Sequence, residues 1–148
     1  MISTKGRYSI RILLDLAEHR NGSYTPMKEV AARQEISLKY IEKLMPALKG
    51  AGLIESSHGI GGGYRLTRKP EEYTLGELLR AAEGSLAPVA CLQCTNDTFC
   101  SQMDTCTTVG VWRDLGRVTS AYLDSKTLAD LLEPTDVNED AARLNRDE

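Results

Sequence analysis

"TPMKEVAARQEISLKYIEKLMPALKGAG", residues 25–52, carries two helical patterns separated by a very short break. Thr25 followed by Pro26 is typical of a helix start, with the threonine as N-cap and the proline at the first helical position. Ser37 takes the same capping role for a second helix, over about residues 38–49. The apolar residues of this second helix recur at helical spacing, so one of its sides is predicted to be buried. Two short helices joined by a tight turn indicate a helix-turn-helix.

The pattern changes period after this pair of helices. Residues 53–58 (LIESSH) and 64–68 (YRLTR) have the character of short strands, and the glycine-rich 59–63 (GIGGG) joins them as a hairpin tip. Residues 8–19 precede the pair and again have apolar residues at helical spacing. This order predicts a winged helix-turn-helix, in which the second helix of the motif enters the major groove of DNA. The predicted fold class is mainly α with a small β wing.

A further long helical pattern lies at residues 109–125. Its apolar residues are spaced by four, three and four positions, which is the seam of a helix that packs against one partner helix, here from a second chain. We therefore expect a long dimerisation helix, followed by a short helix capped by Thr127. Its contact face is assigned to Val111, Trp112, Leu115, Val118 and Tyr122.

The chain is long enough to bury a core without disulfides and is expected to form one small domain with appendages. We divide it into a winged helix-turn-helix domain at 1–84, a cysteine-rich loop at 85–107, a dimerisation helix with a short C-terminal helix at 108–134, and an acidic, disordered tail at 135–148.

The charge distribution indicates a nucleic-acid partner, although the formal net charge of −3 does not. Residues 1–80 carry 13 Lys and Arg against 9 Asp and Glu, whereas residues 81–148 carry 5 against 12. The first part can approach phosphates, and the second would be repelled by them. The predicted recognition helix also has outward residues that suit phosphates and base edges. They are Ser37, Lys39, Tyr40, Glu42, Lys43 and Lys49.

All four cysteines lie within residues 91–106, in CLQCTNDTFCSQMDTC. Three interpretations compete: paired disulfides, a metal or cluster site, and a reactive thiol with a resolving partner. The sequence has no secretory signal pattern and no apolar run near the ~20 residues that span a bilayer, so we expect a cytoplasmic protein without membrane contact. Thiols stay reduced in the cytoplasm, which favours the second and third interpretations.

An enzyme is not expected, nor is a small-molecule substrate. No Ser/His/Asp set, phosphate-binding loop or pair of carboxylates stands out, and the glycine-rich run precedes a strand instead of a helix. A zinc ribbon is disfavoured as well. Cys91-x-x-Cys94 has zinc spacing, but no second C-x-x-C follows it.

Four segments carry a family likeness: STKGRYSIRILLDLA (3–17), ISLKYIEKLMPALKGAGLI (36–54), GIGGGYRLTRKPEEYTLGELLRAAEG (59–84) and VWRDL (111–115). Together they resemble the IscR/NsrR family of bacterial winged-helix transcription regulators, over about residues 2–133. The resemblance implies a homodimer that binds double-stranded operator DNA and carries an iron–sulfur cluster on three cysteines. One branch of similar fold lacks the cysteines and senses cysteine metabolism through a partner enzyme, and the four thiols argue against that branch.

The resemblance also bears on the cluster ligands. The family spaces its cysteines with five residues between them, which Cys94, Cys100 and Cys106 match when counted from Trp112. Counted from the preceding APV, Cys91 takes the first position instead. Cys100 and Cys106 are assigned by either count, and Cys91, Cys94 or both complete the set.

This chain lacks the residues that supply the fourth cluster ligand in the relatives. IscR-type proteins supply a histidine where this chain has Val109, and NsrR-type proteins a carboxylate near the N-terminus, where this chain has Arg7. An all-thiolate site made by all four cysteines is therefore the simplest hypothesis, since iron–sulfur clusters are commonly held by four thiolates. The cluster type, 2Fe–2S or 4Fe–4S, stays open.

The resemblance further implies a DNA-contacting surface. On the recognition helix it comprises Ser37, Lys39, Tyr40, Glu42 and Lys43; at the wing tip His58, Gly59 and Gly61; and on an N-terminal arm Lys5 and Arg7. Relatives often have arginine where this chain has His58. Two functions follow: a regulator whose operator affinity is controlled by the cluster, or a metal-free thiol/disulfide switch of the same fold.

Overall fold

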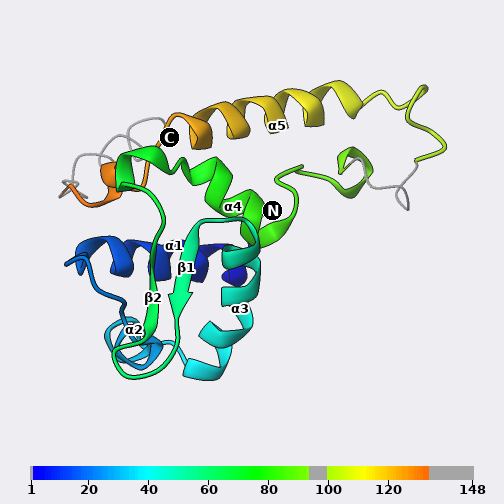
Figure 1. The fold of residues 1–148 in the computed structure, drawn as a ribbon. Helices are drawn as coiled ribbons and strands as arrows, with labels where there is room; N and C mark the ends of the chain where they lie inside the picture. Colours follow the sequence, from blue (N-terminus) through cyan, green and yellow to red (C-terminus); the bar gives the residue numbers. More distant parts are fainter. Residues whose placement is uncertain (1, 94–99, 134–148) are drawn as a thin grey trace.

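The computed structural model describes residues 2–93 and 100–133 of the chain (Figure 1). Five α-helices and a two-stranded antiparallel sheet make up most of the described part, with short 3-10 helices between them. The elements are α1 (Thr4–Glu18), α2 (Met27–Gln34), α3 (Leu38–Gly50), β1 (Ile54–Ser57), β2 (Gly63–Leu66), η1 (Pro70–Glu72), α4 (Leu75–Glu83), η2 (Ala90–Leu92), α5 (Val109–Asp124) and η3 (Ala129–Leu131). The predicted fold class, mainly α with a β wing and a long additional helix, is confirmed.

Helix α2 begins one residue later than the sequence predicts. Its N-cap is Pro26, which has no side chain to accept a cap hydrogen bond. Thr25 instead has a backbone bridge to the wing: its N–H donates to Tyr64 O at 2.8 Å, and Tyr64 N–H donates to Thr25 O at 2.9 Å. The predicted Thr25 cap is therefore wrong, because the residue is extended to pair with β2.

Helix α3 follows after a short break and forms as predicted. Ser37 accepts a hydrogen bond from Tyr40 N at 3.3 Å and caps the helix. The helix continues through Pro46, which is exposed, up to Gly50. Burial of its inner side in the core offsets the one backbone hydrogen bond that the proline removes. That inner side is made of Ile41, Leu44, Met45 and Leu48.

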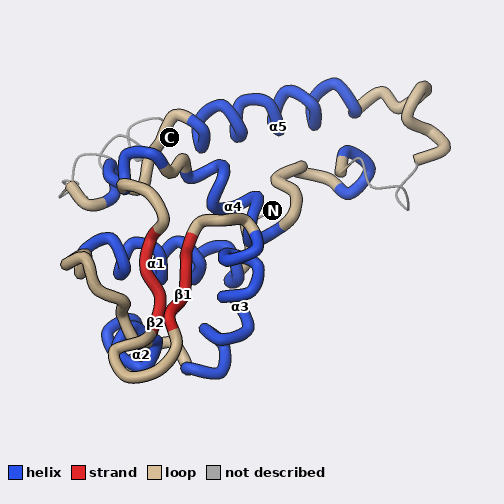
Figure 2. The backbone as a smooth tube through the Cα atoms, viewed as in Figure 1, coloured by secondary structure: helices blue, strands red, loops and turns tan. Residues whose placement is uncertain are grey.

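The wing is a hairpin whose strands pair from Ile54 opposite Leu66 to Ser57 opposite Gly63 (Figure 2). At its tip Gly59 and Gly61 have φ angles of 91° and 75°, which only glycine adopts without strain. Gly63 is needed for a different reason. A Cβ there would lie 2.2 Å from Thr25 O, so only glycine lets the wing approach the start of α2 this closely.

Tyr73 joins three parts of the domain and is fully buried. Its hydroxyl donates to Leu53 O at 2.8 Å and accepts from Arg68 N at 2.9 Å, which fixes the base of the wing. Its carbonyl accepts from Leu128 N at 2.9 Å, which attaches the segment after α5.

The core lies between α1, α3 and α4 and extends under the wing. The end of α4 also holds the start of α1. Glu83 accepts hydrogen bonds from Ser3 N at 2.8 Å and from Gly6 N at 2.9 Å. Burial alone would raise the pKa of Glu83, but these bonds, that of the Ser3 hydroxyl and the charge of Lys5 outweigh it and lower the pKa.

Helix α5 runs over α4 and extends beyond the rest of the domain (Figure 1). Its last turn is held by a buried residue and by an ion pair with α4. Leu123 is its buried residue, and Asp124 accepts two hydrogen bonds from Arg80, at 2.7 and 2.8 Å. The expected short helix after it is a 3-10 turn whose N-cap is Leu128 and not the predicted Thr127. Thr127 lies one residue earlier, and its hydroxyl accepts from Asp130 N at 3.2 Å.

Within the described ranges, no helix combines the length and the apolar character that crossing a membrane requires. The predicted acidic tail, 135–148, lies outside the described residues.

Candidate nucleic-acid interface and cysteine-rich loop

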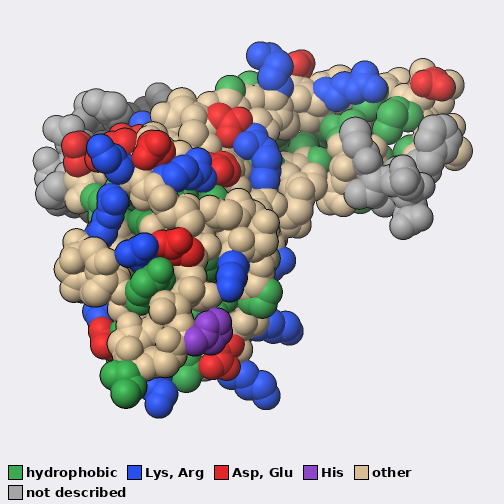
Figure 3. Space-filling model, viewed as in Figure 1, with side chains coloured by type: hydrophobic (Ala, Val, Ile, Leu, Met, Phe, Trp, Pro, Cys, Tyr) green, Lys and Arg blue, Asp and Glu red, His purple; other side chains and the backbone are tan. Residues whose placement is uncertain are grey.

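The outer side of α3 presents charged side chains. Lys39, Glu42 and Lys43 are exposed, as the recognition-helix interpretation requires. Lys49 is tied to the wing, because its Nζ donates to Ser56 Oγ at 2.6 Å. Figure 3 shows Lys and Arg side chains projecting from the edge of the molecule where α3 lies in Figure 1.

Ser37 and Tyr40 have structural contacts in addition to their predicted role. Ser37 is exposed and caps α3 with its side chain. Tyr40 is half-buried, and its ring packs edge-on against Tyr8 of α1, with centroids 5.7 Å apart and an interplanar angle of 88°. Arg11 lies over the other aromatic ring of this pair, 5.4 Å from the Tyr8 centroid. These contacts fix the start of α3 against α1.

Lys5 and Arg7 are exposed, but the structure does not place them on an extended N-terminal arm. They lie in the first turns of α1, which Ser3 caps by accepting from Lys5 N at 3.1 Å. Arg7 donates to Thr4 Oγ1 at 3.2 Å. The predicted N-terminal arm is wrong, because helix α1 already begins at Thr4. Ser3 caps this helix, and Glu83 holds Ser3 in place.

The wing tip exposes His58, Gly59 and Gly61, and between the two glycines it exposes Ile60 completely. Sequence reasoning passed over Ile60, although one branched apolar residue within a glycine run was a visible sign. Its side chain is the most exposed of the large apolar residues in the described part of the chain.

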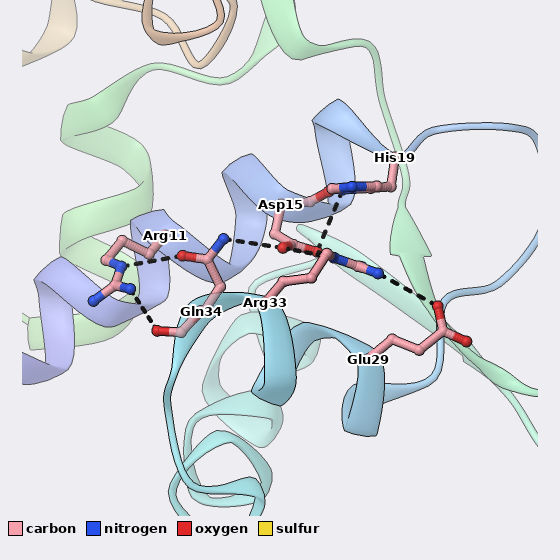
Figure 4. Close-up of polar contacts among 6 residues, drawn as sticks. All are labelled: Arg11, Asp15, His19, Glu29, Arg33 and Gln34. Carbon is pink, nitrogen blue, oxygen red and sulfur yellow. Dashed lines mark hydrogen bonds and ion pairs between the residues drawn. The ribbon is translucent and has the colours of Figure 1, made fainter.

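A buried carboxylate sets how α1 and α2 pack (Figure 4). Asp15 is completely buried, and Arg33 donates to it at 2.6 and 3.0 Å while Gln34 Nε2 donates at 2.9 Å. Arg11 in turn donates to Gln34 Oε1 at 3.1 Å. Burial would raise the pKa of Asp15, but the hydrogen bonds from Arg33 and Gln34 and the charge of Arg33 outweigh it and hold the pKa below its usual value.

The loop that leads to α5 carries the thiols. Cys91, Cys100 and Cys106 are free cysteines and half-buried, and Cys94 lies outside the described residues. Cys91 belongs to η2, and Cys106 lies just before α5. The two therefore lie at the ends of the cysteine stretch, residues 91–106.

Cys106 has the most distinctive surroundings. Thr108 Oγ1 lies 3.3 Å from its Sγ. The pKa of the Cys106 thiol is lowered, first by this hydroxyl and then by hydrogen bonds from the backbone N–H groups of Thr108 and Val109 at the start of α5. A helix start is a setting that favours a thiolate, which is the form that binds metals and reacts with oxidants.

The donor chemistry of the loop fits an iron–sulfur cluster, since half-buried reduced thiols are the groups that hold one. Across 2–93 and 100–133, no three His, Cys, Asp or Glu side chains lie close enough together to hold a metal ion.

The face of α5 predicted for dimerisation is exposed. Its side chains are between 36 % and 62 % accessible; they are Val111, Trp112, Leu115, Val118 and Tyr122. Beside them lies an apolar cleft of about 430 Å³. It is lined by Ile2, Leu86, Pro88, Leu115, Thr119 and Leu123.

Known proteins share this sequence and this fold. The family model of Rrf2, described as an iron-dependent transcriptional regulator, matches residues 2–134. The chain belongs to the Rrf2 family. It is 36 % identical over 146 residues to the HTH-type transcriptional regulator IscR of Aliivibrio salmonicida, and the match covers 99 % of this chain and 85 % of that one.

Solved structures agree with the Rrf2 assignment. CymR of B. subtilis, described as its global cysteine regulator, has a TM-score of 0.72 and 34 % identity, over 92 % of this chain and 98 % of that chain. IscR of T. potens has a TM-score of 0.70 and 36 % identity, over 89 % and 85 %.

The resemblance to IscR-type regulators is thus confirmed, and this Rrf2 protein is a DNA-binding transcription regulator. Its relatives are regulators and not enzymes.

Proposed function

We propose that the protein is a homodimeric regulator whose affinity for double-stranded operator DNA is controlled by an iron–sulfur cluster on the cysteine-rich loop. The observation that carries the proposal is the position of the thiols. The loop joins the DNA-binding part to a helix whose apolar face is uncovered, with Cys91 at one end and Cys106 at the other. The protein would act in the cytoplasm, where DNA and reduced thiols are both found.

The DNA-contacting surface would combine α3 and the wing. Lys39 and Lys43 suit phosphates, and Glu42 suits a base edge such as cytosine N4. Ser37 and Tyr40 would add contacts from the start of α3. At the edges, His58, Gly59 and Gly61 would approach the minor groove, and Lys5 and Arg7 the backbone.

A second copy of the chain would cover the apolar face of α5. A face that places several large apolar side chains in water is unfavourable unless it is covered. A symmetric pair of chains also suits operators with two half-sites, which must lie about 34–36 Å apart, or a multiple of that, to match both recognition helices. The predicted domain boundaries, with 1–84 as the DNA-binding part and 108–134 as the dimerisation part, belong to this proposal.

Cys100 and Cys106 would hold the cluster, together with Cys91, Cys94 or both. A bound cluster of either type supplies iron and a redox centre that iron supply, oxygen or nitric oxide can alter. The chain's own contribution is positional. Ligands at both ends of the loop would tie the end of the DNA-binding part to the start of α5 and so set the spacing of the two recognition helices.

An anaerobic purification tests the cluster. We expect a coloured protein that contains iron and sulfide, and we expect Cys106→Ala and Cys100→Ala to lose both while staying folded dimers. Operator footprinting with and without the cluster should give different affinities. Oxygen-free protein that lacks iron and sulfide, or equal affinities in both forms, would falsify the proposal.

The environment of Cys106 favours one alternative, a thiol/disulfide switch without metal. A lowered thiol pKa is the property of a redox-reactive cysteine. Thiol counting before and after peroxide, on protein shown to be metal-free as isolated, distinguishes the two. Loss of two thiols together with a change in operator affinity supports the switch.

A further inference from the structure

Glu35 forms the turn between α2 and α3 and has a backbone conformation that suits glycine. Its φ of 54° and ψ of 40° are left-handed, and no other non-glycine residue in the described ranges has a positive φ. A side chain disfavours this conformation, because its Cβ crowds the backbone, and such strain persists only where the surroundings hold it. The turn nevertheless depends on it, since Ile36 enters the core and Ser37 caps α3 directly afterwards.

Arg11 of α1 holds the residue immediately before this turn (Figure 4). Its Nη2 donates to Gln34 O at 2.5 Å, and its Nε donates to Gln34 Oε1 at 3.1 Å. The last carbonyl groups of a helix have no partner within it, and a cation at that end also suits the helix dipole. Gln34 is held by α1 a second time, because its Nε2 donates to the buried Asp15 at 2.9 Å. Helix α1 thus fixes the end of α2 where the strained turn begins.

The same arginine supports the far side of the turn. Its guanidinium lies 5.4 Å from the centre of the Tyr8 ring, and Tyr8 packs edge-on against Tyr40 in the first turn of α3. Arg11 therefore acts on both helices that the turn connects. Its own side chain is exposed, so its replacement leaves no cavity in the core.

We propose that Arg11 is a positioning residue for DNA recognition: it holds the left-handed turn at Glu35, and with it the orientation of α3, without touching DNA. Two of its three guanidinium nitrogens donate to Gln34, so the group is committed inside the protein. The proposal rests on the proposed function only for α3 as the helix that contacts DNA.

Operator binding over a salt series tests the proposal. The probe is the double-stranded promoter fragment that the wild-type protein protects in footprinting, and the protein is the full chain purified without oxygen. Arg11→Met keeps the stem of the side chain and removes its donors. We expect the affinity to fall by about threefold to tenfold, the equivalent of about one hydrogen bond. The slope of log affinity against log salt should stay that of wild type, because no phosphate contact is lost.

Arg11→Lys is the second variant. It keeps the charge but loses the fork that reaches both oxygens of Gln34, so its affinity should fall by a similar factor at an unchanged slope. It decides the question if Arg11→Met does not fold, which thermal unfolding shows. An affinity equal to wild type in the folded variants overturns the proposal. A slope reduced by about one in Arg11→Met would make Arg11 a phosphate contact and would also overturn it.

A matched pair of changes at Glu35 separates backbone strain from charge. Glu35→Gly, added to Arg11→Met, should restore the affinity to within about twofold of wild type, because glycine adopts the left-handed conformation without being held. Glu35→Gln in the same background removes the same negative charge but keeps a side chain in the turn, so it should restore nothing. Equal recovery with both changes, or recovery with neither, contradicts the proposed role of the turn.

Hydrogen exchange measures the turn without DNA. Ile36 N–H donates to Ala31 O at 3.2 Å across the turn, so its exchange rate reports how often the turn opens. The rate should rise by about threefold to tenfold in Arg11→Met and stay unchanged in Arg20→Met, an exposed arginine just after α1. An unchanged rate in Arg11→Met overturns the proposal.

The two assays also keep this proposal apart from the proposed function. Lys43→Ala and Glu42→Gln test α3 as the DNA-contacting helix. If neither changes operator binding, the proposed DNA-contacting surface fails, and the link from Arg11 to DNA recognition fails with it. The exchange rate of Ile36 then still decides whether Arg11 holds the turn.

Discussion

The DNA-binding part and the cysteine-rich loop with α5 use their apolar side chains in opposite ways. In residues 2–84 the helices bury their apolar sides against one another, and one core reaches from α1 to the base of the wing. In the loop and α5, the thiols are half-buried and the apolar face lies open. The first part buries its core within one chain, and Leu123 and Leu128 from beyond the loop add to that core. The second leaves thiols and an apolar face uncovered, which in the proposed function a cluster and a second chain would cover.

The largest expected contrast lies between a core leucine and an interface leucine. Leu78→Ala removes a fully buried side chain and should lower the free energy of unfolding by about 2–5 kcal/mol. Leu115→Ala alters an exposed side chain and should cost less than about 0.5 kcal/mol in the monomer, while it weakens the dimer. Urea unfolding and sedimentation measure the two effects. A large loss for Leu115→Ala without any change in oligomeric state would contradict the comparison.

The buried carboxylate of the DNA-binding part should make its stability depend on pH. Asp15→Asn should lower the free energy of unfolding at pH 7 by about 1–3 kcal/mol, because Arg33 loses its ionised partner. The pKa of Asp15 is lowered from 3.8 in the fold, so this stabilisation is present above that value and is lost as the pH falls through the lower folded pKa.

Unfolding at pH 7 and pH 3 should therefore show a gap between wild type and Asp15→Asn that narrows in acid. Glu55→Gln, which breaks the exposed pair with Arg65, is the control and should change stability by less than about 1 kcal/mol at pH 7. A gap that is equal at both pH values would show that the Asp15 charge does not stabilise the fold.

Substitution of Gly63 in the wing and of Gly110 in α5 should have opposite effects on stability. Gly63→Ala would place a Cβ against the Thr25 backbone, and it should cost about 1–3 kcal/mol and weaken operator binding by displacing the wing. Gly110→Ala in α5 meets nothing within 4 Å and should stabilise the chain by up to about 1 kcal/mol. Thermal unfolding and a binding titration check both, and an equal cost at the two sites would remove the distinction.

The smallest expected effect is that of residues on α3 that would contact DNA without responding to the cluster. Lys43→Ala should weaken operator binding by about fivefold, reduce the dependence on salt, and do so equally with and without the cluster. Glu42→Gln should instead change the preferred operator sequence. Binding titrations over a salt series are the measurement. A Lys43→Ala effect confined to one cluster state would place α3 itself among the elements that change.

Local patterns were enough to predict most of the fold, since spacing, the Ser37 cap and the glycine tip act within a few residues. Sequence reasoning failed where the deciding partner is distant. Thr25 pairs with Tyr64, and Lys5 follows a helix start held by Glu83. Asp15 resembles an ordinary surface charge until α2 folds over it.

The candidate site divides in the same way. The residues themselves indicated the outward side of the recognition helix, the cysteine stretch and the exposed side of α5, and the family likeness added the wing tip, Lys5, Arg7 and the cluster. The Thr108 contacts with Cys106 and Trp112 depend on side-chain rotamers at a helix start, which no residue pattern specifies. The exposure of Ile60 could have been predicted from the sequence, because it is a single apolar residue among the glycines of the wing tip.

The attachment of the segment after α5 to Tyr73 has a consequence for protein synthesis. Leu123 and Leu128 belong to the core beneath the wing, and Leu128 completes a backbone bond to Tyr73. A ribosome makes these residues only after it has made every cysteine of the loop. A product that ended within the loop would lack this part of the core, and we expect it to be less stable than the full chain.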